Sequence, residues 1–202
     1  MIEVPYLDLG KIHDEIREEL DTAYHQVMDR EWFIGGEEDK KFERKFADFC
    51  GAKACVGCGN GLDAIRLILL AYGIGKGDEV IVPANTFIAT VLAITYVGAT
   101  PVFVDADITT YNIDIDKIEA KITDRTKAIV VVHLYGRAVN VVQLRKFADK
   151  YSLKIIEDAA ESLGSTYKGK MSGTFGDIGI YSFNGNKIIT TSGGGALVSN
   201  ND

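Results

Sequence analysis

The spacing of apolar positions changes near residue 53, so the two parts of the chain predict different structures. In residues 11–30 and again in residues 38–50, apolar side chains recur every three or four positions. This spacing is typical of amphipathic helices with one apolar face. We therefore interpret residues 1–50 as an N-terminal helical segment that leads into a larger domain at residues 51–202.

After residue 53, short apolar runs rich in Val and Ile alternate with segments of helical spacing. The expected strands are 54–57, 79–82, 101–104, 128–132, 154–157, 179–183 and 196–199, and the expected helices are 61–73, 86–98, 114–121 and 140–151. Residues 128–132 are apolar on both faces, as in a sheet that helices cover on both sides. The pattern predicts an α/β fold of three layers, α-β-α, with a seven-stranded, mostly parallel sheet and right-handed crossovers. Residues 167–171 should form a tight hairpin.

Composition and charge exclude several classes of function. The chain has 202 residues, of which 47% are hydrophobic, and this is enough for one sizeable core. A net charge of −7, with the basic residues scattered, argues against binding nucleic acid or an anionic membrane surface. The longest apolar stretch, at 88–104, contains Thr, Gly and Pro and is too short for a membrane span.

The N-terminus and the cysteines indicate a cytoplasmic protein. Residues 1–8 lack the basic and apolar regions of a secretory signal, and three cysteines are an odd number that suits a reducing compartment. Cys55 and Cys58 have the spacing of half a zinc site or of a redox pair. A second cysteine pair is missing, and the three histidines lie far off in sequence. We therefore interpret the cysteines as small core residues, with no bound metal.

A glycine-rich segment, GCGNGLDA at 57–64, lies between an expected strand and an expected helix. Small residues let backbone N–H groups approach an anion, and a helix N-terminus adds partial positive charge, so a phosphate could bind there. The alternative is an ordinary turn in which Asn60 caps the helix. Taken alone, this short pattern favours the turn.

Polar or aromatic residues follow other expected strands, where ligands of open α/β sheets bind. Phe87, one residue into the next expected helix, could stack on a flat cofactor or pack on its own helix. Asp158 could cap a helix, but Glu157 and Glu161 beside it would make a costly acidic cluster unless a cation lies there. His133 fits a hydrogen-bonded structural role slightly better than a catalytic one.

Lys187 and Asp158 together suggest a particular chemistry. A lysine amine can form a Schiff base, and a carboxylate can keep a heterocyclic nitrogen protonated, which are the two groups that a pyridoxal phosphate enzyme requires. A solvated surface lysine is the common alternative. The flanking sequence, SFNGN before Lys187 and a triple glycine at 193–195, argues against it.

Several motifs in the same order resemble the DegT/DnrJ/EryC1/StrS family of sugar aminotransferases. These motifs are HLYG at 133–136, EDAAE at 157–161, YSFNGNK at 181–187 and GGG at 193–195. The likeness extends through WFIG at 32–35, FERKF at 42–46, NGLDA at 60–64 and PANTFIAT at 83–90. The resemblance implies the large domain of fold-type I pyridoxal phosphate enzymes, with residues 51–202 as the cofactor-binding domain.

The resemblance also implies roles for individual residues. Lys187 would hold pyridoxal 5'-phosphate as a Schiff base, Asp158 would pair with the pyridine nitrogen, and Phe87 would stack on the ring. Glu161, where many members have Gln, would face the 3-oxygen of the cofactor. The phosphate would be held by the backbone amides of Gly61 and Leu62 and by the hydroxyl of Ser182.

The implied activity is amino transfer to a nucleotide-linked keto-deoxy sugar, with glutamate as donor, in surface-glycan or deoxyaminosugar synthesis. Family members continue into a C-terminal small domain and build their site between two subunits. We therefore expect a homodimeric parent and a truncated chain that binds cofactor but transfers amino groups poorly. The alternatives are a cofactor-binding remnant without activity and a sugar dehydratase. Lys187 argues against the dehydratase, because His replaces this lysine in that branch.

Overall fold

The computed structural model describes residues 4–6 and 8–201, with Leu9 described by its backbone alone. Two compact units meet between Phe42 and Glu43, within helix α3 (Glu37–Cys50), whereas the sequence suggested a boundary after residue 50. The first unit also contains α1 (Leu9–Asp14) and α2 (Arg17–Arg30), so the single helix expected at 11–30 is wrong. The two helices are separate because the backbone of Ile16 leaves the helical region, with φ −119° and ψ 12°.

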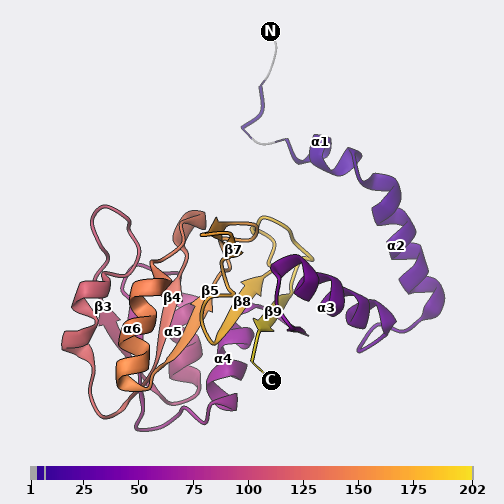
Figure 1. Ribbon diagram of the computed structural model, residues 1–202. Helices are drawn as coiled ribbons and strands as arrows, with labels where there is room; N and C mark the ends of the chain where they lie inside the picture. The colour runs from indigo at the N-terminus through magenta and orange to yellow at the C-terminus, as the bar shows by residue number, and fades with distance from the viewer. Residues whose placement is uncertain (1–3, 7, 202) are drawn as a thin grey trace. The chain divides into compact units, whose positions relative to one another are not determined.

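The second unit is built on a central sheet that contains seven strands in the described part of the chain (Figure 1). The strands are β1 (Ala54–Cys58), β2 (Glu79–Pro83), β3 (Thr100–Val104), β4 (Thr126–Val132), β5 (Lys154–Asp158), β8 (Ile178–Ser182) and β9 (Gly195–Ser199). Their order is β1-β9-β8-β5-β4-β2-β3. Strand β9 runs antiparallel to both of its neighbours, and the other pairings are parallel. The predicted seven-stranded, mostly parallel sheet is confirmed.

Helices cover both faces of the sheet, which confirms the three expected layers. Helices α4 (Gly61–Ala71) and α5 (Ile88–Tyr96) pack on one face, and α6 (Val141–Tyr151) packs on the other (Figure 1). Successive side chains of a strand point to opposite faces. In β4, accordingly, Val130 packs with the α4 and α5 residues, whereas Ile129 and Val131 pack with α6.

Two connecting segments show how local sequence shapes the chain. The helix expected at 114–121 is instead a pair of short 3-10 helices, Ile115–Lys117 and Glu119–Lys121. Asp114 caps the first by accepting the N–H of Asp116, and buried Ile115 and Ile118 follow the three-residue spacing of a 3-10 helix. The predicted hairpin is confirmed as β6 (Thr166–Tyr167) and β7 (Lys170–Met171).

The order in which strands are added to the sheet changes direction at β2, which places a crevice at one edge of the sheet. From β2 the chain passes through α5 to β3 on one side, and it then returns to β4 on the other side of β2. In open α/β sheets, ligands bind beyond the carboxyl ends of the strands at such a reversal. None of the helices in the described residues is both long enough and apolar enough to cross a membrane.

Candidate active site

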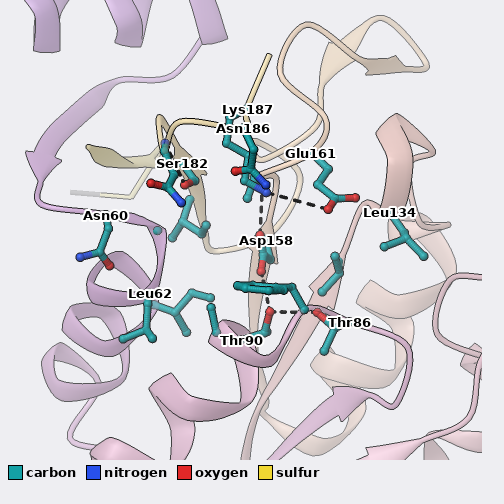
Figure 2. A pocket seen from close by; sticks show the side chains of 18 residues that line it. Asn60, Leu62, Thr86, Thr90, Leu134, Asp158, Glu161, Ser182, Asn186 and Lys187 are labelled. Carbon is teal, nitrogen blue, oxygen red and sulfur yellow. Dashed lines mark hydrogen bonds and ion pairs between the residues drawn. The ribbon is translucent and has the colours of Figure 1, made fainter. Parts of the chain in front are cut away.

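A cavity of about 300 Å³ lies at the carboxyl edge of the sheet (Figure 2). Segments that follow β1, β2, β4, β5 and β8 form its walls. These strands run in one direction, so their carboxyl ends meet at a single edge even though the residues are far apart in sequence. Every site residue predicted from the sequence lines this cavity: Gly61, Leu62, Phe87, Asp158, Glu161, Ser182 and Lys187.

The N-terminus of α4 forms one wall. Asn60 caps the helix, its side chain accepting the N–H of Asp63 at 2.8 Å. The N–H groups of Gly61 and Leu62 come before any carbonyl of their own helix, and the helix dipole adds partial positive charge at this end. A Cβ at Gly61 would lie 3.0 Å from the Cβ of Ser182. This wall is therefore suited to an anion and depends on the small size of Gly61.

Strand β9 approaches the same turn closely. A Cβ at Gly195 would lie 2.5 Å from the carbonyl carbon of Asn60 and 2.9 Å from the backbone nitrogen of Gly61. Such distances are shorter than real Cβ contacts, and the neighbouring atoms are backbone, so no side chain can be accommodated without moving the helix N-terminus.

Asp158 lies at the bottom of the cavity, at the end of β5. Its Oδ2 accepts a hydrogen bond from Thr90 Oγ1 at 2.8 Å, and its Oδ1 accepts one from the backbone N–H of Ala160 at 3.1 Å. Burial raises the pKa of Asp158, and these hydrogen bonds and the positive charge of Lys187 oppose that rise. A buried carboxylate in this setting favours a cationic partner.

Lys187 and Glu161 lie on the opposite side of Asp158 from Thr90 (Figure 2). Lys187 belongs to the loop between β8 and β9, and its side chain is only 16% exposed, so it is not a solvated surface lysine. Its Nζ is 3.9 Å from Glu161 Oε1, and Glu161 Oε2 accepts the backbone N–H of Tyr135 at 3.1 Å. The amine therefore lies inside the cavity near the Glu161 carboxylate, and its positive charge also acts on Asp158.

Phe87 lines the cavity from the N-cap position of α5. The expectation that it lies one residue into the helix is wrong, because its backbone is extended and the helix begins at Ile88. The residue is 69% exposed, so it does not pack into the core on its own helix. An exposed aromatic ring at a cavity wall remains available to a flat ligand.

Comparison with known proteins identifies the family of this chain. The model of the DegT/DnrJ/EryC1/StrS aminotransferase family matches residues 14–202. The chain belongs to this family. It is 51% identical over 199 residues to the dTDP-3-amino-3,6-dideoxy-alpha-D-galactopyranose transaminase of Aneurinibacillus thermoaerophilus. The matched region covers 98% of this chain and 55% of that protein.

Two further proteins extend the comparison. GDP-perosamine synthase of Caulobacter vibrioides is 48% identical over 201 residues, 100% of this chain and 52% of that protein. The crystal structure of S. venezuelae DesV in complex with a ketimine intermediate superposes with a TM-score of 0.94 at 40% identity, and the match covers 100% of this chain and 54% of that one. The chain thus spans about half the length of the relatives that it matches.

The resemblance to the DegT/DnrJ/EryC1/StrS family gave no role to Thr90, which the structure places in contact with Asp158. Thr90 Oγ1 also lies 2.9 Å from Thr86 Oγ1, and both residues line the cavity. Thr90 is 1% exposed in an otherwise apolar stretch of α5. A single hydroxyl on the buried side of an apolar helix is the signal in the sequence that could have identified it.

Glu157 and His133 form a separate buried pair outside the cavity. Glu157 accepts the backbone N–H groups of Gly173, Phe175 and Gly176, and it bonds His133 Nε2 at 2.6 Å. The expectation that Glu157 clusters with Asp158 and Glu161 is therefore wrong. Glu157 and Asp158 are adjacent in a strand, so their side chains face opposite sides of the sheet. The preference for a hydrogen-bonded structural His133 is confirmed.

The cysteines are also part of the core. All three are free, and Cys55 packs against β8 and β9 residues on one face while Cys58 packs against the α4 face. Positions three apart in a strand point to opposite sides, so this pair cannot share a ligand. In the described residues, no three His, Cys, Asp or Glu side chains come together as a metal site.

Proposed function

We propose that this chain is the cofactor-binding part of a pyridoxal phosphate-dependent aminotransferase that acts on a nucleotide-linked keto-deoxy sugar. The observation that carries the proposal is the meeting of the Lys187 amine, the buried Asp158 carboxylate and the N-terminus of α4 in one cavity. The donor would be an amino acid, glutamate by family resemblance, and the product would serve surface-glycan or deoxyaminosugar synthesis.

The residues present fit this cofactor. The amides of Gly61 and Leu62 and the hydroxyl of Ser182 would hold its phosphate, where a Cβ at Gly61 would otherwise intrude. Asp158 would accept the hydrogen of the ring nitrogen, and Phe87 would cover the ring. Glu161 would face the 3-oxygen, and Lys187 would bind the aldehyde carbon.

When bound, the cofactor supplies an aldehyde that condenses with amines and a ring that takes up an electron pair from the neighbouring carbon. Lys187 Nζ would take up the proton that leaves the substrate carbon and would hold it for return at the end of the step. Asp158 would place its carboxylate beside the ring nitrogen, where a negative charge would make the ring a better electron acceptor. Glu161 keeps the Lys187 amine close, at 3.9 Å.

Partners and location are also proposals. The relatives named above are a transaminase and a synthase of dTDP- and GDP-linked amino sugars, which supports a nucleotide sugar as the substrate. Exposed Phe87 and Ile188 lie at or beside the cavity, which supports burial of this edge in a homodimer. The net charge of −7 argues against nucleic acid and membrane surfaces and is compatible with the cytoplasm.

The direct test is to add pyridoxal phosphate to the purified chain, record the absorbance spectrum, reduce with borohydride and map the modified peptide. We expect the label on Lys187, with Lys187→Arg unlabelled. Labelling of a different lysine would overturn the assignment. Product analysis with nucleotide-linked keto sugars and glutamate then separates amino transfer from dehydration, and a labelled chain without turnover would be a cofactor-binding remnant.

A further inference from the structure

Two threonine hydroxyls connect the start of α5 to the carboxylate of Asp158 (Figure 2). Thr86 precedes the helix, and Thr90 lies in its first turn. The 2.9 Å contact between the two hydroxyls and the 2.8 Å contact from Thr90 to Asp158 Oδ2 form a continuous chain of hydrogen bonds. Each of the three residues also lines the cavity.

The direction of this chain follows from the number of hydrogens available. Each hydroxyl has one hydrogen, and an ionised carboxylate can only accept. Thr90 therefore gives its hydrogen to Asp158, and Thr86 must donate to Thr90. The N–H of Ala160 donates to Oδ1, so each oxygen of Asp158 has one donor inside the protein. Each oxygen keeps further acceptor capacity, which can be directed into the cavity.

We propose that Thr90 is a positioning residue for Asp158, and that Thr86 and Thr90 fix its carboxylate as an acceptor facing the cofactor ring nitrogen. This inference rests on the function proposed above. It extends that function to Thr86 and Thr90, which would act on the cofactor indirectly, through Asp158. The geometry gives the reason: the contact orients Oδ2 from the side opposite Lys187 and Glu161.

Packing alone does not explain a hydroxyl at position 90. Thr90 is 1% exposed, and the residues beside it in α5 are apolar, so Val, which has the same shape, would fill this site equally well. Burying a hydroxyl is unfavourable unless it is hydrogen-bonded. The bond that satisfies this one goes to Asp158, so the hydroxyl is needed for the carboxylate and not for the helix.

The same helix provides a matched control. Thr95 lies near the end of α5, is exposed, and donates to the carbonyl of Leu92 at 3.0 Å. Thr95→Val removes the same hydroxyl from the same helix without touching the cavity. Thr90→Ser keeps the hydroxyl at position 90 and removes only a methyl group.

The experiment measures the affinity of each variant for two probes, pyridoxal phosphate and its 1-deaza analogue, in which carbon replaces the ring nitrogen. Absorbance titration gives the dissociation constants, and thermal unfolding without ligand checks folding. Thr90→Val should weaken pyridoxal phosphate binding about ten-fold, the effect of losing one hydrogen bond to a charged group. Thr90→Ser and Thr95→Val should bind it as tightly as the unchanged chain.

The 1-deaza analogue separates positioning from structure. Since it offers no ring nitrogen to Asp158, Thr90→Val and the unchanged chain should bind it equally. Equal loss for both probes, or no loss for either, would overturn the inference. If Thr90→Val does not fold, Thr86→Val takes its place, because Thr86 is only half-buried. If Thr86→Val then binds pyridoxal phosphate as tightly as the unchanged chain does, that result would count against the proposal. Failure of the unchanged chain to bind pyridoxal phosphate would instead refute the proposed function.

Discussion

Replacing Glu157 with Gln should destabilise the fold far more than its conservative chemistry suggests. The side chain of Glu157 is fully buried, and its Oε1 accepts the N–H groups of Phe175 and Gly176. Its Oε2 accepts the N–H of Gly173 at 2.8 Å and bonds the ring of His133. Each oxygen of Glu157 therefore faces two donors. A glutamine keeps only one of the two oxygens and replaces the other with an NH₂ group, which is itself a donor and cannot accept from the two donors that face it.

The size of the effect follows from this count. A hydrogen bond to a charged group contributes about 1.5–3 kcal/mol, so losing two gives about 3–6 kcal/mol. His133 cannot compensate by exchanging its ring hydrogen, because its Nδ1 already accepts the N–H of Val139 at 3.1 Å. Against a total stability of about 5–15 kcal/mol for a typical domain, this loss is large.

Urea unfolding followed by circular dichroism would measure the change. Glu161→Gln is the matched control, since Glu161 is partly exposed and accepts one backbone N–H, that of Tyr135. We expect this control to change the free energy of unfolding by about 1 kcal/mol or less. A loss below about 1 kcal/mol for Glu157→Gln, or equal losses in the two variants, would refute the reasoning.

Three further predictions concern single sites. Burial raises the pKa of Asp158 above its ordinary value of 3.8, so the folded chain holds this proton more readily than the unfolded chain and loses stability as the pH rises from that value. Asp158→Asn should therefore raise the melting temperature of the ligand-free chain at neutral pH, and a lower melting temperature would contradict this. Gly195→Ala should abolish tight pyridoxal phosphate binding in a titration, whereas Gly193→Ala, whose added Cβ has its nearest neighbour at 3.9 Å, should not; equal affinities would show that the turn can move. Tyr181→Phe removes the buried hydroxyl bond to the carbonyl of Ser172 and should cost about 1 kcal/mol of unfolding free energy in urea, with unchanged cofactor affinity.

The layers of the fold could be predicted because they depend on local patterns. A strand such as β4 is apolar on both faces, and that alone indicates a sheet covered on both sides. The order of the strands could not be predicted, because the place of β9 between β1 and β8 depends on pairing between distant segments. The helix expected at 114–121 failed because its apolar spacing also fits a 3-10 turn.

The candidate site could be predicted where residue type is decisive and not where orientation is. Lys187 and Asp158 are chemical groups that a cofactor of this kind requires, so their types and their flanking motifs pointed to them. Thr90 was missed because a threonine in a helix has no particular chemistry until its hydroxyl is seen to reach Asp158. Glu157 was misplaced because its nearness to Asp158 in sequence outweighed the alternation of side chains along a strand.

The pairing of β1 with β9 has a consequence for the order in which parts of the chain fold. Ala54 pairs with Ser199, so β1 has to wait for a partner that is synthesised much later. Contacts between such distant segments form slowly. The turn at Asn60, where we propose that the phosphate binds, follows β1 directly, and Gly195 of β9 packs against it. We therefore expect cofactor affinity to appear only when β9 has docked, so that binding reports the last step of folding and an incompletely folded chain remains unable to capture the cofactor.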